Sequence, residues 1–166
     1  MASPNTSFSA GAVLTAAQMN NLPFGLVGQT SATAATAITA NTSLTILSLT
    51  VTLYPNRLYR IHGQAALQAT SAAATVQMLW LEATGFTTRT IMFNGHNLPQ
   101  YFSTMIAGNL YATAADFGVT SGSGTSKTLN LRIRMNAGGA LNTDPDAIIG
   151  ANSIPQRLWI EDIGSA

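Results

Sequence analysis

The chain has 166 residues, no cysteine, and a formal net charge of +1 from seven basic and six acidic side chains. This length fits one domain with its own core, and the lack of cysteine excludes disulfides, thiolate metal sites and cysteine nucleophiles. Because only 8% of the residues are charged, the composition gives no electrostatic basis for binding nucleic acid or an anionic membrane.

The first element in chain order is an N-terminal arm over residues 1–28, which carries no charged side chain. It has no run of about 18 apolar residues and no secretory signal, so neither a membrane span nor export is predicted and we expect synthesis in the cytoplasm. A short helix is possible over 15–21, ended by Pro23. An exposed, uncharged chain of this kind aggregates unless it is covered. We therefore expect the arm to dock on other protein through its apolar side chains, which are Phe8, Val13, Leu14, Met19, Leu22 and Phe24.

Residues 29–166 alternate apolar and polar side chains in short runs, which is the pattern of half-buried β-strands. Turn chemistry is expected between these runs, at residues 54–56, 84–85, 94–97, 122–124 and 142–145. With no long amphipathic helix, this pattern predicts an all-β fold, an antiparallel β-sandwich of the jelly-roll type behind the extended arm. The strands are expected within 25–40 and over 47–53, 59–68, 76–80, 91–93, 102–106, 129–136 and 158–164.

Two motifs could carry chemistry but are better explained as structure. Residues 124–128 resemble a phosphate-binding loop, yet serines stand at the two positions where its glycines belong, so a loop leading into a strand is favoured. Asp144 and Asp146 could contribute to a calcium site, but no further ligands are visible, and acidic turns next to proline are common.

The remaining polar candidates also favour a structural interpretation. His62 and His96 have no partner at metal-binding spacing, and we expect His62 on a polar strand face and His96 in a turn. Arg132 and Arg134 share a strand face and are predicted to pair with Glu161 and Asp162, within the sheet or across subunits. No catalytic constellation stands out, so the sequence predicts a protein that is not an enzyme and has no metal or cofactor.

Three segments resemble small virion proteins of tailed phages, especially those that infect actinobacteria. Residues 8–20, FSAGAVLTAAQMN, are similar to the opening of these proteins, 57–61 to an internal strand, and 158–164, LWIEDIG, to their closing strand. The resemblance implies a jelly roll like that of tumour necrosis factor, assembled as a homotrimer. Such proteins are variously minor capsid, head-fibre or minor tail proteins.

The preferred function is therefore a trimeric decoration or minor capsid protein on the virion surface. It would dock on the major capsid protein or another virion protein through the arm and stabilise the shell. The sequence has no coiled-coil or fibrous shaft that would hold a receptor-binding tip away from the particle, which favours direct docking. The alternative is a tail or head-fibre adsorption protein that binds host cell-wall glycan through residues 94–100. Its aromatic contacts would come from Trp80, Trp159, Tyr101 and Tyr111, although core packing explains most of these more simply.

Overall fold

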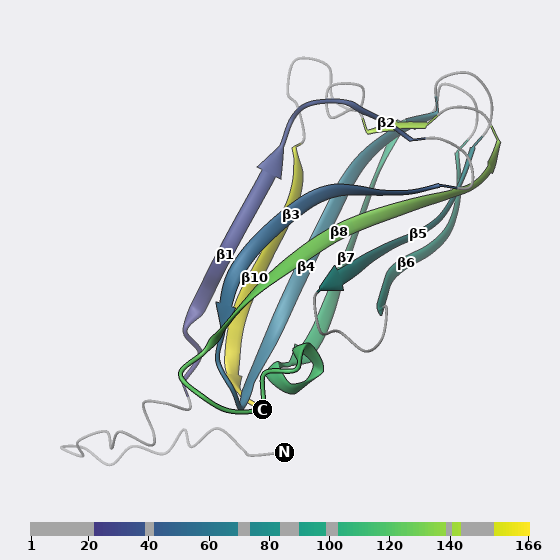
Figure 1. Ribbon diagram of the computed structural model, residues 1–166. Helices are drawn as coiled ribbons and strands as arrows, with labels where there is room; N and C mark the ends of the chain where they lie inside the picture. The colour runs from purple at the N-terminus through teal and green to yellow at the C-terminus, as the bar shows by residue number, and fades with distance from the viewer. Residues whose placement is uncertain are drawn as a thin grey trace, which may run out of the picture.

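A computed structural model describes residues 22–38, 42–69, 74–83, 90–98, 103–138, 141–143 and 155–166. Within these ranges the chain forms β-strands and one turn of 3-10 helix, η1 (Ala114–Phe117). The strands make two antiparallel sheets that pack face to face (Figure 1). The predicted antiparallel β-sandwich is confirmed. None of the described helical residues forms a segment long and apolar enough to cross a membrane.

The two sheets are named A and B. Sheet B contains, in spatial order, β3 (Ser43–Leu53), β8 (Thr125–Gly138), β5 (Ala74–Ala83) and β6 (Thr90–Leu98). Sheet A contains β1 (Gly25–Ala32), β2 (Thr36–Ile38), β4 (Arg57–Ala69), β7 (Ser103–Thr113), β9 (Leu141–Thr143) and β10 (Gln156–Ser165).

Strand β4 is the centre of sheet A. One side of β4 pairs with β7, and the other side pairs with β10 and, farther along, with β9. Strands β1 and β2 then pair with β10 and β9. Sheet A therefore has four strand positions, as sheet B does, and the chain passes repeatedly from one sheet to the other. This is the jelly-roll arrangement.

The core lies between the sheets because alternate residues of each strand point inward. In β3 the buried positions are Leu47, Leu49, Val51 and Leu53, and in β8 they are Leu129, Leu131 and Ile133. Sheet A contributes Tyr59, Ile61, Ala65, Leu67, Ile106, Leu110, Ala112, Leu158 and Ile160. The period-two spacing in the sequence thus identified the inner faces of both sheets.

Two predicted turns are wrong. Residues 94–97 belong to β6, where Asn94 and His96 pair with Met78 and Val76 of β5, so His96 lies in a strand. Likewise, Asn142 lies in β9 and pairs with β2 and β4. Asn and Gly favour turns locally, but pairing with a neighbouring strand overrides that preference. The turn at 54–56 is confirmed: it connects β3 of sheet B to β4 of sheet A, and Asn56 has a positive φ of 57°.

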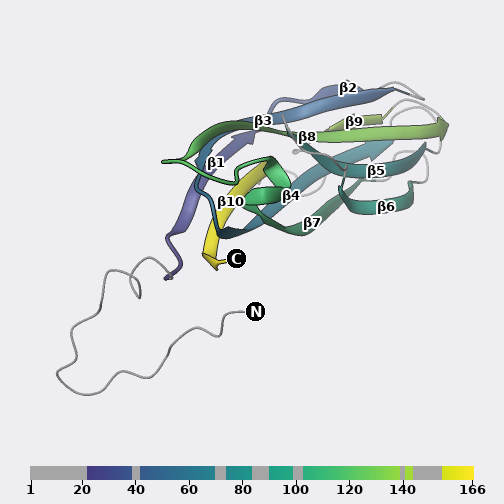
Figure 2. The ribbon, with the colours of Figure 1, turned by 60° about the horizontal axis from the view of Figure 1, so that its bottom comes forward.

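The end of the predicted arm is part of sheet A. Strand β1 begins at Gly25, so residues 25–28 pair with β10, and a Cβ on Gly28 would lie 2.6 Å from Cγ1 of Val51 across the sandwich. The start of β1 and the end of β10 lie at the same end of the molecule (Figure 2). Outside the described residues lie the helix expected over 15–21, Asp144 and Asp146, and the arm residues Phe8, Val13, Leu14 and Met19.

Candidate interaction face of sheet A

The outer face of sheet A, turned away from sheet B, carries three rows of side chains that run across four strands. Residues directly opposite each other in antiparallel strands project from the same side, so the register defines the rows. In the order β1, β10, β4, β7, the rows are Leu26-Glu161-Arg60-Tyr111, Gln29-Trp159-His62-Asn109 and Ser31-Arg157-Gln64-Ala107. We call these residues the sheet A face.

The first row contains a closed ion pair. The guanidinium of Arg60 donates from Nε to Oε2 of Glu161 at 2.7 Å, and Nη2 contacts the same oxygen. This hydrogen bond, together with the negative charge of Glu161, raises the pKa of Arg60, and a hydrogen bond with Tyr111 contributes less. The two charges cancel, so the row presents an electrically neutral surface flanked by Leu26 and Tyr111.

The second row holds an aromatic stack. The rings of His62 and Trp159 lie with their centroids 3.9 Å apart and an interplanar angle of 20°. Because an amide oxygen can only accept, Nδ1 of His62 donates to Oδ1 of Asn109, at 2.7 Å. Asn109 therefore orients the imidazole, and the imidazole supports the half-buried indole of Trp159.

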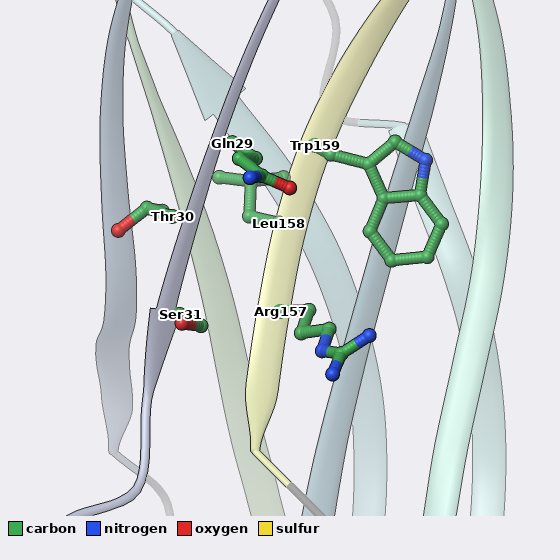
Figure 3. A pocket seen from close by; sticks show the side chains of 6 residues that line it. All are labelled: Gln29, Thr30, Ser31, Arg157, Leu158 and Trp159. Carbon is green, nitrogen blue, oxygen red and sulfur yellow. The ribbon is translucent and has the colours of Figure 1, made fainter. Parts of the chain in front are cut away.

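The third row borders a pocket of about 430 Å³, which is lined by Gln29, Thr30, Ser31, Arg157, Leu158 and Trp159 (Figure 3). The side chains of Trp159 and Arg157 extend from the same side of β10, as expected for residues two apart in a strand. Arg157 is exposed, and its backbone pairs with Ser31 of β1 and Gln64 of β4. The side chain of Gln64 donates to the carbonyl oxygen of Pro155 at 2.8 Å.

A buried ion pair holds the root of the arm at one end of this face. Arg57 and Asp162 are only 5% and 1% exposed, and Nε of Arg57 donates to Oδ2 of Asp162 at 2.7 Å. The same guanidinium donates from Nη2 to the carbonyl oxygen of Leu22. Its central carbon lies 4.2 Å from the centroid of the Phe24 ring, a cation–π contact. Arg57 thus links the chain before β1 to the closing strand.

Leu22 and Phe24 are the two predicted docking residues that lie within the described part of the chain. Their side chains are 44% and 60% exposed, so Arg57 fixes the backbone without burying either of them. Leu26, two residues farther along, is 56% exposed. Three exposed apolar residues, Leu22, Phe24 and Leu26, therefore lie close together in the sequence where the arm meets the sandwich.

Within one chain, the predicted pairing of Arg132 and Arg134 with Glu161 and Asp162 is wrong. Arg132 pairs with Glu82 of β5, whereas Glu161 and Asp162 pair with arginines of β4. The sequence also did not reveal the stack of His62 on Trp159, because the two residues lie on strands far apart in the chain. The only signal was the polar alternation of Arg60, His62 and Gln64, which marks an outer strand face without naming the strand opposite.

The outer face of sheet B has a different character. Ser48 donates to Oδ1 of Asn130 at 2.7 Å, and the hydroxyls of Thr50 and Thr128 lie 2.9 Å apart. Short polar side chains thus bond to one another across β3 and β8. The loop expected at 124–128 is wrong for residues 125–128, which form the start of β8 and pair with β3, because strand pairing extends the regular structure back to Thr125. Among the described residues no cluster of three His, Asp or Glu side chains could hold a metal ion.

No protein-family model matches the sequence, and no curated protein matches it. Solved structures with a similar fold include the VP2 subviral particle of infectious bursal disease virus, with a TM-score of 0.52 and 10% identity over 86% of this chain. The T13 viral particle of the same virus gives a TM-score of 0.51 and 10% identity over 84% of this chain. The alignments span 39% and 36% of those longer chains, respectively. The likeness shows that the jelly roll of this chain also occurs within the protein of a virus particle.

Proposed function

We propose that this chain is a non-enzymatic structural protein of a phage virion, a trimeric decoration or minor capsid protein that docks on the outer capsid and stabilises it. The observation that carries the proposal is the exposure of three apolar residues, Leu22, Phe24 and Leu26, at the root of an arm without charged residues. Exposed apolar patches mark protein interaction sites. The similar fold in capsid proteins and the resemblance of residues 8–20 to phage virion proteins support the assignment to a particle.

Docking would follow from the burial of apolar arm side chains against the major capsid protein or another virion protein. Each Å² of apolar surface removed from water contributes roughly 25 cal/mol. In a trimer, three linked arms would raise the effective concentration of each further contact. The bond from Arg57 to the carbonyl oxygen of Leu22 limits how far the root of each arm can swing, which favours simultaneous engagement.

Binding to particles tests the docking proposal. In the full chain, replacing Phe8, Leu14 and Met19 by Ser should weaken co-sedimentation with particles that lack this protein by more than about tenfold, because three large apolar side chains lose their contacts. Replacing Ala10, Ala12 and Ala16 by Ser makes the same number of changes in the same segment and should have little effect. Equal binding by both variants would contradict docking through the arm.

The oligomeric state is tested separately. Light scattering on the purified chain should give a mass three times 17.3 kDa. A monomer at micromolar concentration would refute the trimer and leave docking of single copies in place.

A second candidate is adsorption to host cell-wall glycan, favoured by the partly open indole of Trp159 on the sheet A face. The loop expected at 94–100 gives this candidate no support, because β6 extends to Leu98. Immuno-electron microscopy distinguishes the two roles: label over the whole head supports decoration, and label confined to the tail tip supports adsorption.

A further inference from the structure

We propose that the pocket beside Trp159 binds a sugar ring that carries a carboxylate, such as a uronic acid within a polysaccharide. This proposal develops the adsorption candidate, because it names a site and a ligand class on the body of the molecule. It uses no residue of the arm, so it holds or fails independently of capsid docking.

The indole of Trp159 forms an aromatic platform in the lining of the pocket. One ring face of Trp159 rests on His62, which is itself held by Asn109, so the indole is positioned before any ligand arrives. The indole extends from β10 on the same side as Arg157 (Figure 3), and it is half-buried, so part of its surface is open to a ligand. The flat, apolar C–H side of a pyranose ring packs well on an aromatic face, and a platform fixed in advance loses little conformational entropy on binding.

Polar side chains of β1 border this platform. Gln29 lies directly opposite Trp159 across β1 and β10, and Ser31 lies opposite Arg157. An amide and a hydroxyl both donate and accept hydrogen bonds, which suits the hydroxyl groups of a sugar. The pocket volume of about 430 Å³ is within the usual range for small-ligand sites.

The pocket lining also includes a positively charged side chain, Arg157. Arg157 is the only charged side chain that lines the pocket among the described residues. The carboxylates that follow it on β10, Glu161 and Asp162, are already paired with Arg60 and Arg57. Within the described part of the chain, the pocket therefore carries one positive charge, and the nearby carboxylates of β10 are engaged elsewhere. A guanidinium binds a carboxylate through two parallel hydrogen bonds, which selects an acidic sugar over a neutral one.

Titration of the isotope-labelled full chain by NMR tests the proposal with three probes: methyl glucuronide, the neutral methyl glucoside, and acetate. We expect methyl glucuronide to shift backbone amide signals of residues 29–31 and 157–159, and to bind at least about tenfold tighter than either other probe. Arg157→Gln should reduce the affinity for glucuronide to that for glucoside. Lys127→Gln on β8 removes one positive charge from sheet B and should change nothing.

Trp159→Ala should abolish binding of both sugars, and Trp159→Phe, which keeps a ring, should retain part of it even if the alanine variant is unstable. Equal affinity for acetate and glucuronide would show a plain anion site and overturn the sugar assignment. Equal affinity for glucoside and glucuronide, unaffected by Arg157→Gln, would overturn the role of charge. No shift with any probe, as when another copy of the chain covers this face, would overturn the site itself.

Discussion

The two sheets have similar inner faces and dissimilar outer faces. Inward, both present alternating Leu, Ile and Val side chains that are fully buried. Outward, each sheet has an ion pair, but sheet B otherwise shows short hydroxyl and amide side chains bonded to one another, whereas sheet A adds an aromatic stack and a pocket. Inward patterning therefore determines the sandwich, while among the described side chains the aromatic stack and the pocket both lie on the outer surface of sheet A.

Exposed apolar side chains follow the same division. Among the described side chains, the exposed large apolar residues within strands are Leu26, Met105 and Tyr111, all in sheet A. On sheet B, the polar groups of Ser48 and Thr50 already have partners within the sheet. Hydroxyl groups that already have partners gain little by contacting another molecule, whereas Leu26, Met105 and Tyr111 would bury apolar surface, so partners are expected on sheet A.

The largest difference in the free energy of unfolding is expected between two ion pairs. The pair Arg57–Asp162 of sheet A is buried, whereas the pair Arg132–Glu82 of sheet B is partly exposed. Asp162→Asn should lower the free energy of unfolding by about 3–5 kcal/mol, since it leaves the buried charge of Arg57 without its counter-ion. Glu82→Gln, which breaks the pair with Arg132, should cost less than about 1 kcal/mol. Urea denaturation at neutral pH measures both. Similar losses of stability in the two variants would contradict the expected difference between a buried and a partly exposed ion pair.

The next largest effect on stability is expected at Tyr59, on the inner side of sheet A, in comparison with Tyr111 on its outer side. Burial raises the pKa of Tyr59 above its usual 10.0, and its hydroxyl oxygen accepts a hydrogen bond from the backbone N–H of Tyr54 at 2.8 Å. The folded state therefore favours the neutral phenol. Its contribution to stability is complete below about pH 10 and is lost as the pH rises through the folded pKa.

Tyr59→Phe should cost about 1–3 kcal/mol at neutral pH, because the N–H of Tyr54 loses its acceptor. The variant should also lose less stability than the wild type between about pH 9 and pH 11. Urea denaturation across this range measures both effects. Tyr111→Phe, on the exposed side of the same sheet, serves as the matched control. An unchanged alkaline slope in Tyr59→Phe would rule out ionisation of Tyr59 as the cause.

The smallest expected effect compares single contacts on the two outer faces. His62→Ala removes the stack under Trp159 and the bond to Asn109, and should cost about 1 kcal/mol. Thr50→Ala removes one hydroxyl contact with Thr128 and should cost about 0.2–0.5 kcal/mol. Thermal unfolding followed by circular dichroism resolves the order. A larger loss for Thr50→Ala would contradict the view that sheet A has the stronger surface contacts.

Much of the fold was predictable because period-two spacing is a local signal. The alternate apolar residues from Leu47 to Leu53 and from Leu129 to Ile133 were predicted to face the core, and they are buried. The turn at 94–97 failed for the opposite reason: Asn and Gly carry a local turn signal, but pairing with β5, a contact outside the segment, determines its structure.

The candidate site was much less predictable. The sequence pointed to Trp159 as an aromatic contact and to Leu22 and Phe24 as arm residues. It did not predict that His62 contacts Trp159 or that Arg57 contacts Leu22 and Phe24. Arg60 and Glu161 are separated by 101 positions, and Arg57 and Asp162 by 105. A single sequence shows which side chains face outward but does not specify the register between distant strands, and the rows of the sheet A face depend on that register.

The position of β10 has a consequence for biosynthesis. Among the described strands this one comes last in the sequence, yet it lies between β1 and β4, so it must insert into the interior of sheet A and not add to an edge. Until it emerges from the ribosome, β1 has no partner strand and one side of β4 is largely open. Completion of the sandwich therefore waits for β10 and requires closure of a loop of roughly a hundred residues, a slow step by the dependence of folding rate on contact order. A nascent or prematurely terminated chain would expose two unpaired strand edges, and aggregation of such fragments is the expected hazard of producing this protein at high level.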